Sequence, residues 1–149
     1  MRAVLQRVQW AKVEIDSIVR GEIAQGFLLL VGVYDKDTEL EAKVLAKKAS
    51  ELRVFEDGCG KMNLSLHDVG GGMLIIPNFT ICADASHGRR PSFIAAASPE
   101  QAKPLYERFI SFVRENGIDI VKTGEFGADM KVSLLNDGPI TIILDTDDL

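Results

Sequence analysis

A Gly-Pro step at positions 138 and 139 stands between two runs that are typical of β-strands, Met130–Leu135 and Ile140–Leu144. Proline has no N–H to donate to a sheet ladder, so it belongs at a sheet edge, a bulge or a turn. A bend of this composition presents two backbone carbonyls with few side-chain atoms around them, and it can bind a ligand through main-chain atoms. A plain turn is the alternative, and for an isolated Asn-Asp-Gly-Pro sequence it is the commoner outcome.

The rest of the chain predicts an α+β fold in one domain, residues 1–149, a length that fits a single domain. The run Gly26–Tyr34 is continuously apolar, which indicates a strand buried on both faces. Strands and helices do not alternate regularly, so we expect a mostly antiparallel or mixed sheet. The predicted strands are 3–9, 13–18, 21–23, 26–34, 52–55, 73–77, 118–123, 130–135 and 140–144.

Two capping boxes predict the two main helices. In Thr38–Glu41, a threonine hydroxyl at the N-cap is followed three residues later by a glutamate, and the helix should reach about Glu51. In Ser98–Gln101, a proline occupies the first helical position and a glutamine closes the box. Gly117 then has the composition of a residue that ends the second helix.

Charge and cysteine content restrict the partners and the compartment. The net charge of −5 argues against sequence-blind binding to long nucleic acid, so we expect no DNA partner. A single RNA end held by a local basic patch stays possible, with Arg89-Arg90 and Lys47-Lys48 as candidates beside a plain solvated surface. Cys59 and Cys82 make no disulfide framework, and no apolar run approaches the ~20 residues of a membrane span, which predicts reduced thiols in a cytoplasmic protein without a membrane partner.

The usual machinery for acid-base or metal chemistry is missing from the sequence. The histidines, His67 and His87, stand in polar turns, and no H-x-x-x-H or C-x-x-C spacing predicts a metal site. Gly70–Gly72 is not followed by Lys-Ser or Lys-Thr, so it is no phosphate loop. We therefore expect no metal and no cofactor, and a reaction that needs little more than positioning of the substrate and stabilisation of a developing oxyanion by backbone N–H groups.

Four separated motifs carry a resemblance to a known family: Gln6–Val8, Gly60–Asn63, Gly88–Phe93 and Thr123–Met130. In this order they resemble the D-aminoacyl-tRNA deacylases, also called D-tyrosyl-tRNA deacylases, over essentially the whole chain. The resemblance implies a sheet that rolls toward a barrel and a homodimer that acts on the aminoacylated 3′ end of tRNA. The implied reaction is hydrolysis of the ester of D-aminoacyl-tRNA, and of glycyl-tRNA, as chiral proofreading.

One motif departs from the family pattern. Where the family has Ser-Gln-Phe-Thr-Leu, this chain has Pro77-Asn78-Phe79-Thr80-Ile81. The resemblance makes Asn78, Phe79 and Thr80 the catalytic candidates, in a site built largely from main chain, with the ribose of the substrate taking part. Core packing for Phe79 and a strand position for Thr80 are the alternatives. Pro77, a substrate-binding candidate, lacks a hydroxyl and an N–H, and a related branch that also carries proline here has relaxed chiral selectivity.

The resemblance also assigns the substrate-binding residues. Gly138-Pro139 becomes a cis step that reaches into the pocket of the partner subunit, where its carbonyls face the substrate amino group and exclude an L side chain. Phe126 and Met130 hold the terminal adenine, with core packing as their alternative. Arg7 hydrogen-bonds around the Gly-Pro segment, with a surface charge as its alternative. The residues expected to hold the backbone of the bend are Asn136 and Thr141.

Two further functions from other classes remain open at this point. One is a non-catalytic dimer that binds a tRNA end or a nucleotide, in which the change at Pro77-Asn78 has silenced the site. The other is a purely structural dimer. Turnover of a D-aminoacyl-tRNA distinguishes both from the deacylase.

Overall fold

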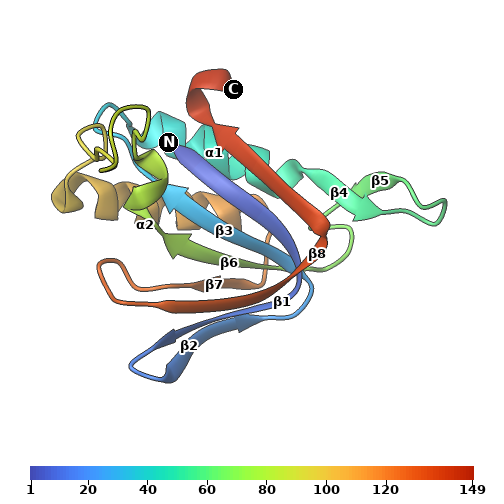
Figure 1. Cartoon of the computed structure of the whole chain (residues 1–149). Helices are drawn as coiled ribbons and strands as arrows, with labels where there is room; N and C mark the ends of the chain where they lie inside the picture. Colours follow the sequence, from blue (N-terminus) through green and yellow to red (C-terminus); the bar gives the residue numbers. More distant parts are fainter.

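A six-stranded sheet, a separate two-stranded hairpin and two α-helices make up the computed structural model, which describes residues 1–149 (Figure 1). The strands are β1 (Arg2–Ile15), β2 (Ile18–Ile23), β3 (Gly26–Gly32), β4 (Arg53–Glu56), β5 (Met62–Ser65), β6 (Gly72–Pro77), β7 (Val121–Thr123) and β8 (Lys131–Asp145). The helices are α1 (Glu39–Glu51) and α2 (Pro99–Glu115), with short 3₁₀ turns η1 (Phe79–Cys82) and η2 (Thr146–Asp148).

The large sheet is mixed and nearly closed on itself. Its order is β2-β1-β3-β6-β7, and β8 pairs with β1. The pairs made by β1 are antiparallel, whereas β3–β6 and β6–β7 are parallel. The two end strands approach each other, since a Cβ built on Gly21 of β2 would lie 3.2 Å from the Cβ of Lys122 in β7. The α+β class and the rolled, mixed sheet expected from the sequence are confirmed.

Strands β3 and β6 separate two apolar cores. Phe27 and Leu29 of β3 lie in the larger core, together with buried residues of α1 and α2. Leu28 of β3 and Leu74 of β6 point to the other side, into a smaller core enclosed by the rolled sheet. The period of two along a strand explains the division, because neighbouring side chains point to opposite faces. The prediction that Gly26–Tyr34 forms a strand buried on both faces is confirmed.

The two predicted capping boxes have different outcomes. At Thr38 the box forms as expected, with the threonine side chain accepting from the first helical turn and Glu41 accepting from the Thr38 N–H at 2.7 Å. The box expected at Ser98 is absent, because its side chain makes no cap hydrogen bond. Gln101 instead donates from Nε2 to the Asp35 carbonyl at 2.7 Å, which ties α2 to the loop after β3. Gly117 follows α2 with the expected positive φ of 85°.

Several predicted strand boundaries are wrong. A tight turn at Asp16 and Ser17, both with positive φ, divides the expected strand Val13–Ile18 between β1 and β2. The expected strand 118–123 is reduced to Val121–Thr123, and the hairpin strand Met62–Ser65 was not predicted. The two runs around Gly138-Pro139 belong to one interrupted strand, β8. Neither α-helix has the length and apolar character that crossing a membrane requires.

Candidate active site

The segment Pro77–Thr80 lies at the carboxyl end of β6, beside the end of the parallel strand β3. Asn78 turns the chain out of the sheet: its N–H donates to the Val31 carbonyl at 2.8 Å, and its side chain caps η1 by accepting from the Thr80 N–H at 3.1 Å. The Thr80 hydroxyl also donates to Asn78 Oδ1. The Asn78 side chain therefore accepts from both the N–H and the hydroxyl of Thr80. The three catalytic candidates, Asn78, Phe79 and Thr80, thus form one local unit.

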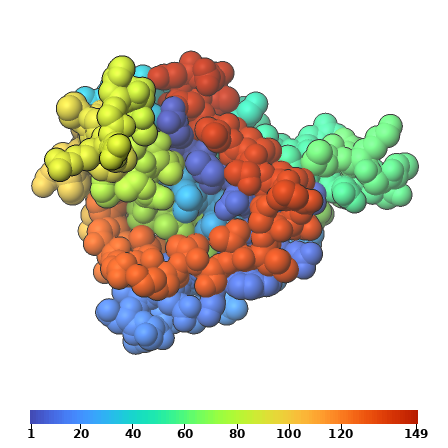
Figure 2. Space-filling view, in the orientation of Figure 1, coloured from blue at the N-terminus to red at the C-terminus, as the bar shows by residue number.

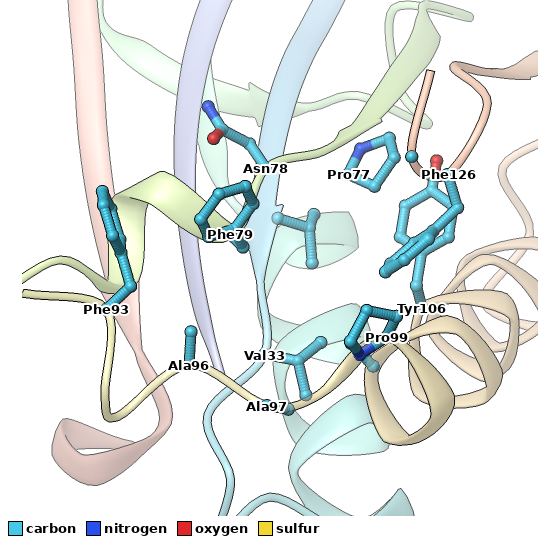
Figure 3. A pocket seen from close by; sticks show the side chains of 13 residues that line it. Val33, Pro77, Asn78, Phe79, Phe93, Ala96, Ala97, Pro99, Tyr106 and Phe126 are labelled. Atoms are coloured by element: carbon cyan, nitrogen blue, oxygen red, sulfur yellow. The ribbon is translucent and has the colours of Figure 1, made fainter. Parts of the chain in front are cut away.

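An apolar hollow of about 380 Å³ opens on one side of this unit. Figure 3 shows Phe79 and Phe93 on one side of it, with Phe126, Tyr106 and Pro99 across from them. The Phe79 and Phe93 rings meet edge to face at a centroid distance of 5.2 Å. Apolar walls with aromatic faces suit a flat, uncharged ring system such as a nucleobase.

A more open groove of about 630 Å³ adjoins the hollow, and Figure 2 shows a recess between the green surface near residue 80 and the orange surface near residue 130. Thr80 and Met130 line the groove but not the hollow, whereas Phe126 lines only the hollow. Pro77, Asn78, Phe79 and Gly127 line both. The structure thus brings the motif residues together and separates Phe126 from Met130, which the sequence assigned to a single adenine contact.

The side chains of this region differ in burial: Phe126 and Met130 are partly buried against the two cores, as their core-packing alternative expects, whereas Phe79 and Thr80 are not. Phe79 is 56% exposed, so the core alternative for this residue is wrong. Thr80 is exposed on a 3₁₀ turn, so the strand alternative is wrong as well. Tyr106 donates from its hydroxyl to the Ile75 carbonyl at 2.8 Å, and burial raises the pKa of that hydroxyl. Burial also raises the pKa of the Cys82 thiol, at the end of η1, to about 11, so both groups stay neutral near pH 7.

The Gly-Pro bend is a bulge in the pairing of β1 with β8. Gln6 lies opposite Thr141 and Val8 opposite Asn136, so the single residue Arg7 faces the four residues 137–140. The peptide bond between Gly138 and Pro139 is cis. The extra residues loop out of the sheet, and both Gly138 and Pro139 are exposed.

Buried hydrogen bonds hold the bulge in place. Arg7 is only 7% exposed and donates from Nε to the Asp137 carbonyl at 3.2 Å and from Nη1 to the Val54 carbonyl at 2.7 Å. Asn136 donates from Nδ2 to the carbonyls of Arg7 and Ile140, at 3.0 and 2.9 Å. Arg7 is therefore no surface charge, and Asn136 holds the backbone of the bend as expected. Thr141 takes part only through its hydroxyl, which accepts from Gln6 Nε2 at 3.2 Å.

The bend and the catalytic candidates of one chain do not form a common site. Neither Gly138 nor Pro139 lines the hollow or the groove beside η1. In Figure 1 the kink of β8 lies on the right, at the end of the sheet from which β4 and β5 project, and η1 lies on the left. Nowhere in the chain do three or more His, Cys, Asp or Glu side chains cluster as metal ligands do.

Three residues of the hollow were missed as site residues from the sequence. Tyr106 and Pro99 were counted only as parts of the helix α2, and Phe93 only as part of a family motif. An aromatic residue on the apolar stripe of a helix gives no sign of whether it faces a core or a cavity. The one available signal was Phe93, an aromatic residue within the polar stretch that follows η1.

Comparisons with known proteins show the family of the chain. The model of the family described as D-Tyr-tRNA(Tyr) deacylase matches residues 4–145. The chain belongs to this family. A D-aminoacyl-tRNA deacylase of Geobacter sulfurreducens is 52% identical over 146 residues, which are 98% of this chain and 95% of that protein. The corresponding protein of Thermus aquaticus is 53% identical with the same coverage.

Solved structures resemble the chain over nearly its full length. The c-Myc DNA Unwinding Element Binding Protein superposes with a TM-score of 0.92 at 36% identity, covering 97% of this chain and 98% of that one. A protein described as a probable eukaryotic D-amino acid tRNA deacylase superposes with a TM-score of 0.82 at 18% identity, covering 96% and 97%. The second likeness shows the shared fold.

Proposed function

We propose that the chain hydrolyses the ester bond of D-aminoacyl-tRNA and releases the free amino acid and tRNA. Membership of the deacylase family supports the reaction. The observation that carries it in the structure is the apolar hollow next to a groove that holds Thr80 and the start of η1. The hollow suits the terminal adenine of tRNA, and the groove suits the aminoacyl ester attached to its ribose.

Hydrolysis of the ester requires that the site position the substrate and stabilise the oxyanion that develops on the ester carbonyl. Phe79 is the first residue of η1, so its N–H has no partner within the helix and is available to the ester carbonyl. Water attacks the carbonyl carbon and gives up a proton, and the neighbouring ribose 2′-OH, which is both a donor and an acceptor, orients this water. The bond from that carbon to the ribose oxygen breaks, and the ribose oxygen takes a proton. Thr80 holds Asn78 and the attacking group in place and forms no covalent intermediate, because no base accepts its proton.

We propose that the bend at Gly138-Pro139 supplies the chiral filter in the partner's site. Asn136 and the buried Arg7 hold the bend, which suits a steric barrier. An L side chain would meet its carbonyls and the proline ring, whereas a D side chain points to solvent. Rejection by exclusion tolerates many D side chains and also admits glycine. Because Pro77 and Asn78 replace the family's serine and glutamine, rejection of L substrates is the feature most open to change.

The filter requires a homodimer, because the bend lies away from η1 within one chain. Exposed apolar side chains support an interface on the strands that carry the bend: Trp10 of β1 is 40% exposed and faces Leu135 of β8, which is 46% exposed. A two-fold interface would place two equal sites symmetrically. Sedimentation at micromolar concentration should give a dimer, and a monomer that deacylates D-aminoacyl-tRNA would contradict the cross-subunit filter.

The decisive experiment compares initial rates of deacylation of D-Tyr-tRNA, Gly-tRNA and L-Tyr-tRNA, each with and without EDTA. We expect turnover of D-Tyr-tRNA and Gly-tRNA, poor turnover of L-Tyr-tRNA, and no effect of chelation. Binding of the tRNA without turnover would support a silenced dimer that binds a tRNA end or a nucleotide. Absence of both binding and turnover would support a structural dimer. Equal rates for D-Tyr and L-Tyr would mean relaxed chirality.

A further inference from the structure

The loop Ala85–Pro91 projects beside the candidate active site and is closed at its base. Asp84 and Ser92 exchange two backbone hydrogen bonds of 2.8 Å each, one in each direction. The Asp84 carboxylate also accepts from the Ser86 N–H at 2.9 Å, and hydrogen bonds from the side chain and the backbone of Ser86 lower the pKa of that carboxyl. The loop therefore begins and ends at one fixed point, and Phe93, the residue after Ser92, lines the hollow.

The charge of this loop is the opposite of the chain's. Residues 85–91 carry Arg89 and Arg90 and no acidic residue, in a chain of net charge −5. Both arginines are exposed, and neither makes an ion pair or a side-chain hydrogen bond. Arg2 and Arg108, in contrast, pair with Asp145 and Glu39. Two adjacent guanidinium groups without partners can bind an anion from outside the chain.

A further lysine lies near the same hollow. Lys103 of α2 is exposed and makes no ion pair, and it stands on the helix whose residues Pro99 and Tyr106 line the hollow. Glu100 and Glu107 lie at helical spacing on either side of it, so its charge adds less than that of the two arginines. On the groove side, Asp129 lies beside Lys131, which donates to both of its carboxylate oxygens at 3.1 Å. The unpaired positive charge is thus on the side of Phe93 and Pro99.

We propose that the loop Ala85–Pro91 is a phosphate-binding element for the single-stranded 3′ end of tRNA. Arg89 and Arg90 bind the backbone phosphates just upstream of the terminal nucleoside, and Lys103 contributes a third positive charge. The inference rests on the proposed function, because the terminal adenosine must occupy the hollow for the preceding phosphates to reach the loop. It also sets the polarity of the complex: the RNA strand leaves the hollow past Phe93, and the amino acid points into the groove.

The chemistry of the two arginines fits this ligand. A guanidinium group forms paired hydrogen bonds to phosphate oxygens and needs no particular base beside it. Contacts of this kind position a nucleic acid without reading its sequence. A clamp of two phosphates should therefore help every tRNA alike, whereas the bend and the groove select the amino acid.

The test compares two substrates that share the ester and the terminal adenosine, of which only one carries the rest of the tRNA with its phosphates. One is D-Tyr-tRNA, and the other is D-tyrosyl-adenosine, the same ester on a nucleoside without phosphates. The variants are the double change Arg89→Ala/Arg90→Ala, the charge-conserving Arg89→Lys/Arg90→Lys, and the matched control Lys47→Ala/Lys48→Ala. The control removes the same charge from exposed positions on α1. Thermal unfolding shows whether each variant is folded.

We expect the double alanine variant to raise KM for D-Tyr-tRNA about tenfold, with kcat little changed, since phosphate contacts are made equally in ground and transition states. Rates on D-tyrosyl-adenosine should stay unchanged. The lysine variant should recover most of the loss. For two phosphates on a single strand, the slope of log(kcat/KM) against log salt should become shallower by about 1.4.

Three results would overturn the inference. One is an unchanged KM for D-Tyr-tRNA in the double alanine variant, and another is an equal loss on both substrates, which would mean that the loop shapes the hollow. The third is an equal effect of the control variant, which would mean that only net charge matters. If the unchanged protein deacylates neither substrate, the proposed function fails first and the inference with it.

Discussion

The two parts of the proposed site are held in opposite ways. The bulge around Gly138-Pro139 is fixed by the buried side chain of Arg7 and by two hydrogen bonds from Asn136, and only a hollow of about 240 Å³ adjoins it. The segment Asn78–Thr80 lies between the larger hollow and the groove, and it is held by local hydrogen bonds of Asn78 with Thr80 and with the Val31 carbonyl. A steric filter has to be stiff, whereas an oxyanion site needs free donors, and this difference predicts distinct mutational behaviour.

The largest effect is expected from Arg7→Ala. The change leaves the carbonyls of Val54 and Asp137 without their donor and opens a space next to the bulge. Arg7 Nε also pairs with the Asp137 carboxylate at 3.2 Å, and because that side chain is about one-third exposed, we expect a loss of about 2–3 kcal/mol in the free energy of unfolding, below the range for a fully buried pair. Urea denaturation measures it. Arg53→Ala is the control, because Arg53 is exposed, and an equal loss there would contradict the assignment.

A smaller loss is expected from Gly138→Ala. Gly138 has a φ of 131°, and an added Cβ would lie 2.8 Å from the backbone nitrogen of Ile140. The bend must then shift, at a cost of about 1–3 kcal/mol. Discrimination between D-Tyr-tRNA and L-Tyr-tRNA should fall with it. Gly58→Ala, where no atom lies within 4 Å of the added Cβ, should change neither stability nor selectivity. Retained discrimination in the Gly138 variant would remove the bend from the chiral filter.

Thr80→Ala should affect rate more than stability. The hydroxyl is exposed and supports Asn78 through one hydrogen bond, so we expect kcat to fall about fivefold, equivalent to about 1 kcal/mol. A nucleophilic hydroxyl would instead lose several orders of magnitude. Single-turnover kinetics with Ser111→Ala as the reference, whose hydroxyl only donates to the Glu107 carbonyl, measures the difference. A covalent aminoacyl-Thr80 adduct in mass spectrometry would overturn the mechanism.

Alkylation of the native protein's thiols at pH 8 should leave the rate of deacylation unchanged. Cys82 is the buried last residue of η1 and has a raised pKa of about 11, so its thiol stays protonated, whereas Cys59 is exposed in the β4–β5 loop. Iodoacetamide should modify Cys59 in the native protein and reach Cys82 only in denaturant, as peptide mass spectrometry can show. Fast modification of Cys82 in the native state would mean that η1 opens. The difference in rigidity between η1 and the bulge around Gly138-Pro139 would then be greater.

Much of the fold could be predicted because the local signals agree with the packing. The apolar run Gly26–Tyr34 and the Thr38 box specify β3 and the start of α1 without help from distant residues. The turn at Asp16-Ser17 was missed because both residues take positive φ without a glycine to mark it. The Ser98 box was wrong because Gln101 bonds to the loop after β3, a tertiary contact that spacing cannot reveal.

The sequence proposed members of the candidate site but could not predict their arrangement. Motif positions proposed Thr80, Phe126, Met130 and the Gly-Pro step, and these roles stay predictions. The sequence left two roles open for Arg7, a surface charge or hydrogen bonds around the Gly-Pro segment. Only the fold brings the Val54 carbonyl beside its side chain. The sequence also assigned Phe126 and Met130 to the same adenine. The two residues are only four positions apart in the chain, yet Phe126 lines the hollow and Met130 lines the groove.

The two cores on either side of β3 and β6 have a consequence for motion. A strand covered on both faces can exchange its amide hydrogens with solvent only when both layers open together, so β3 should be among the slowest segments in hydrogen exchange. The hollow rests on this strand through Val31, and Val33, which directly follows the strand, also lines it. The floor of the hollow should therefore stay fixed while its rim, the loop Ala85–Pro91, exchanges quickly, which would let a long RNA enter without loosening the surface on which its last base is held.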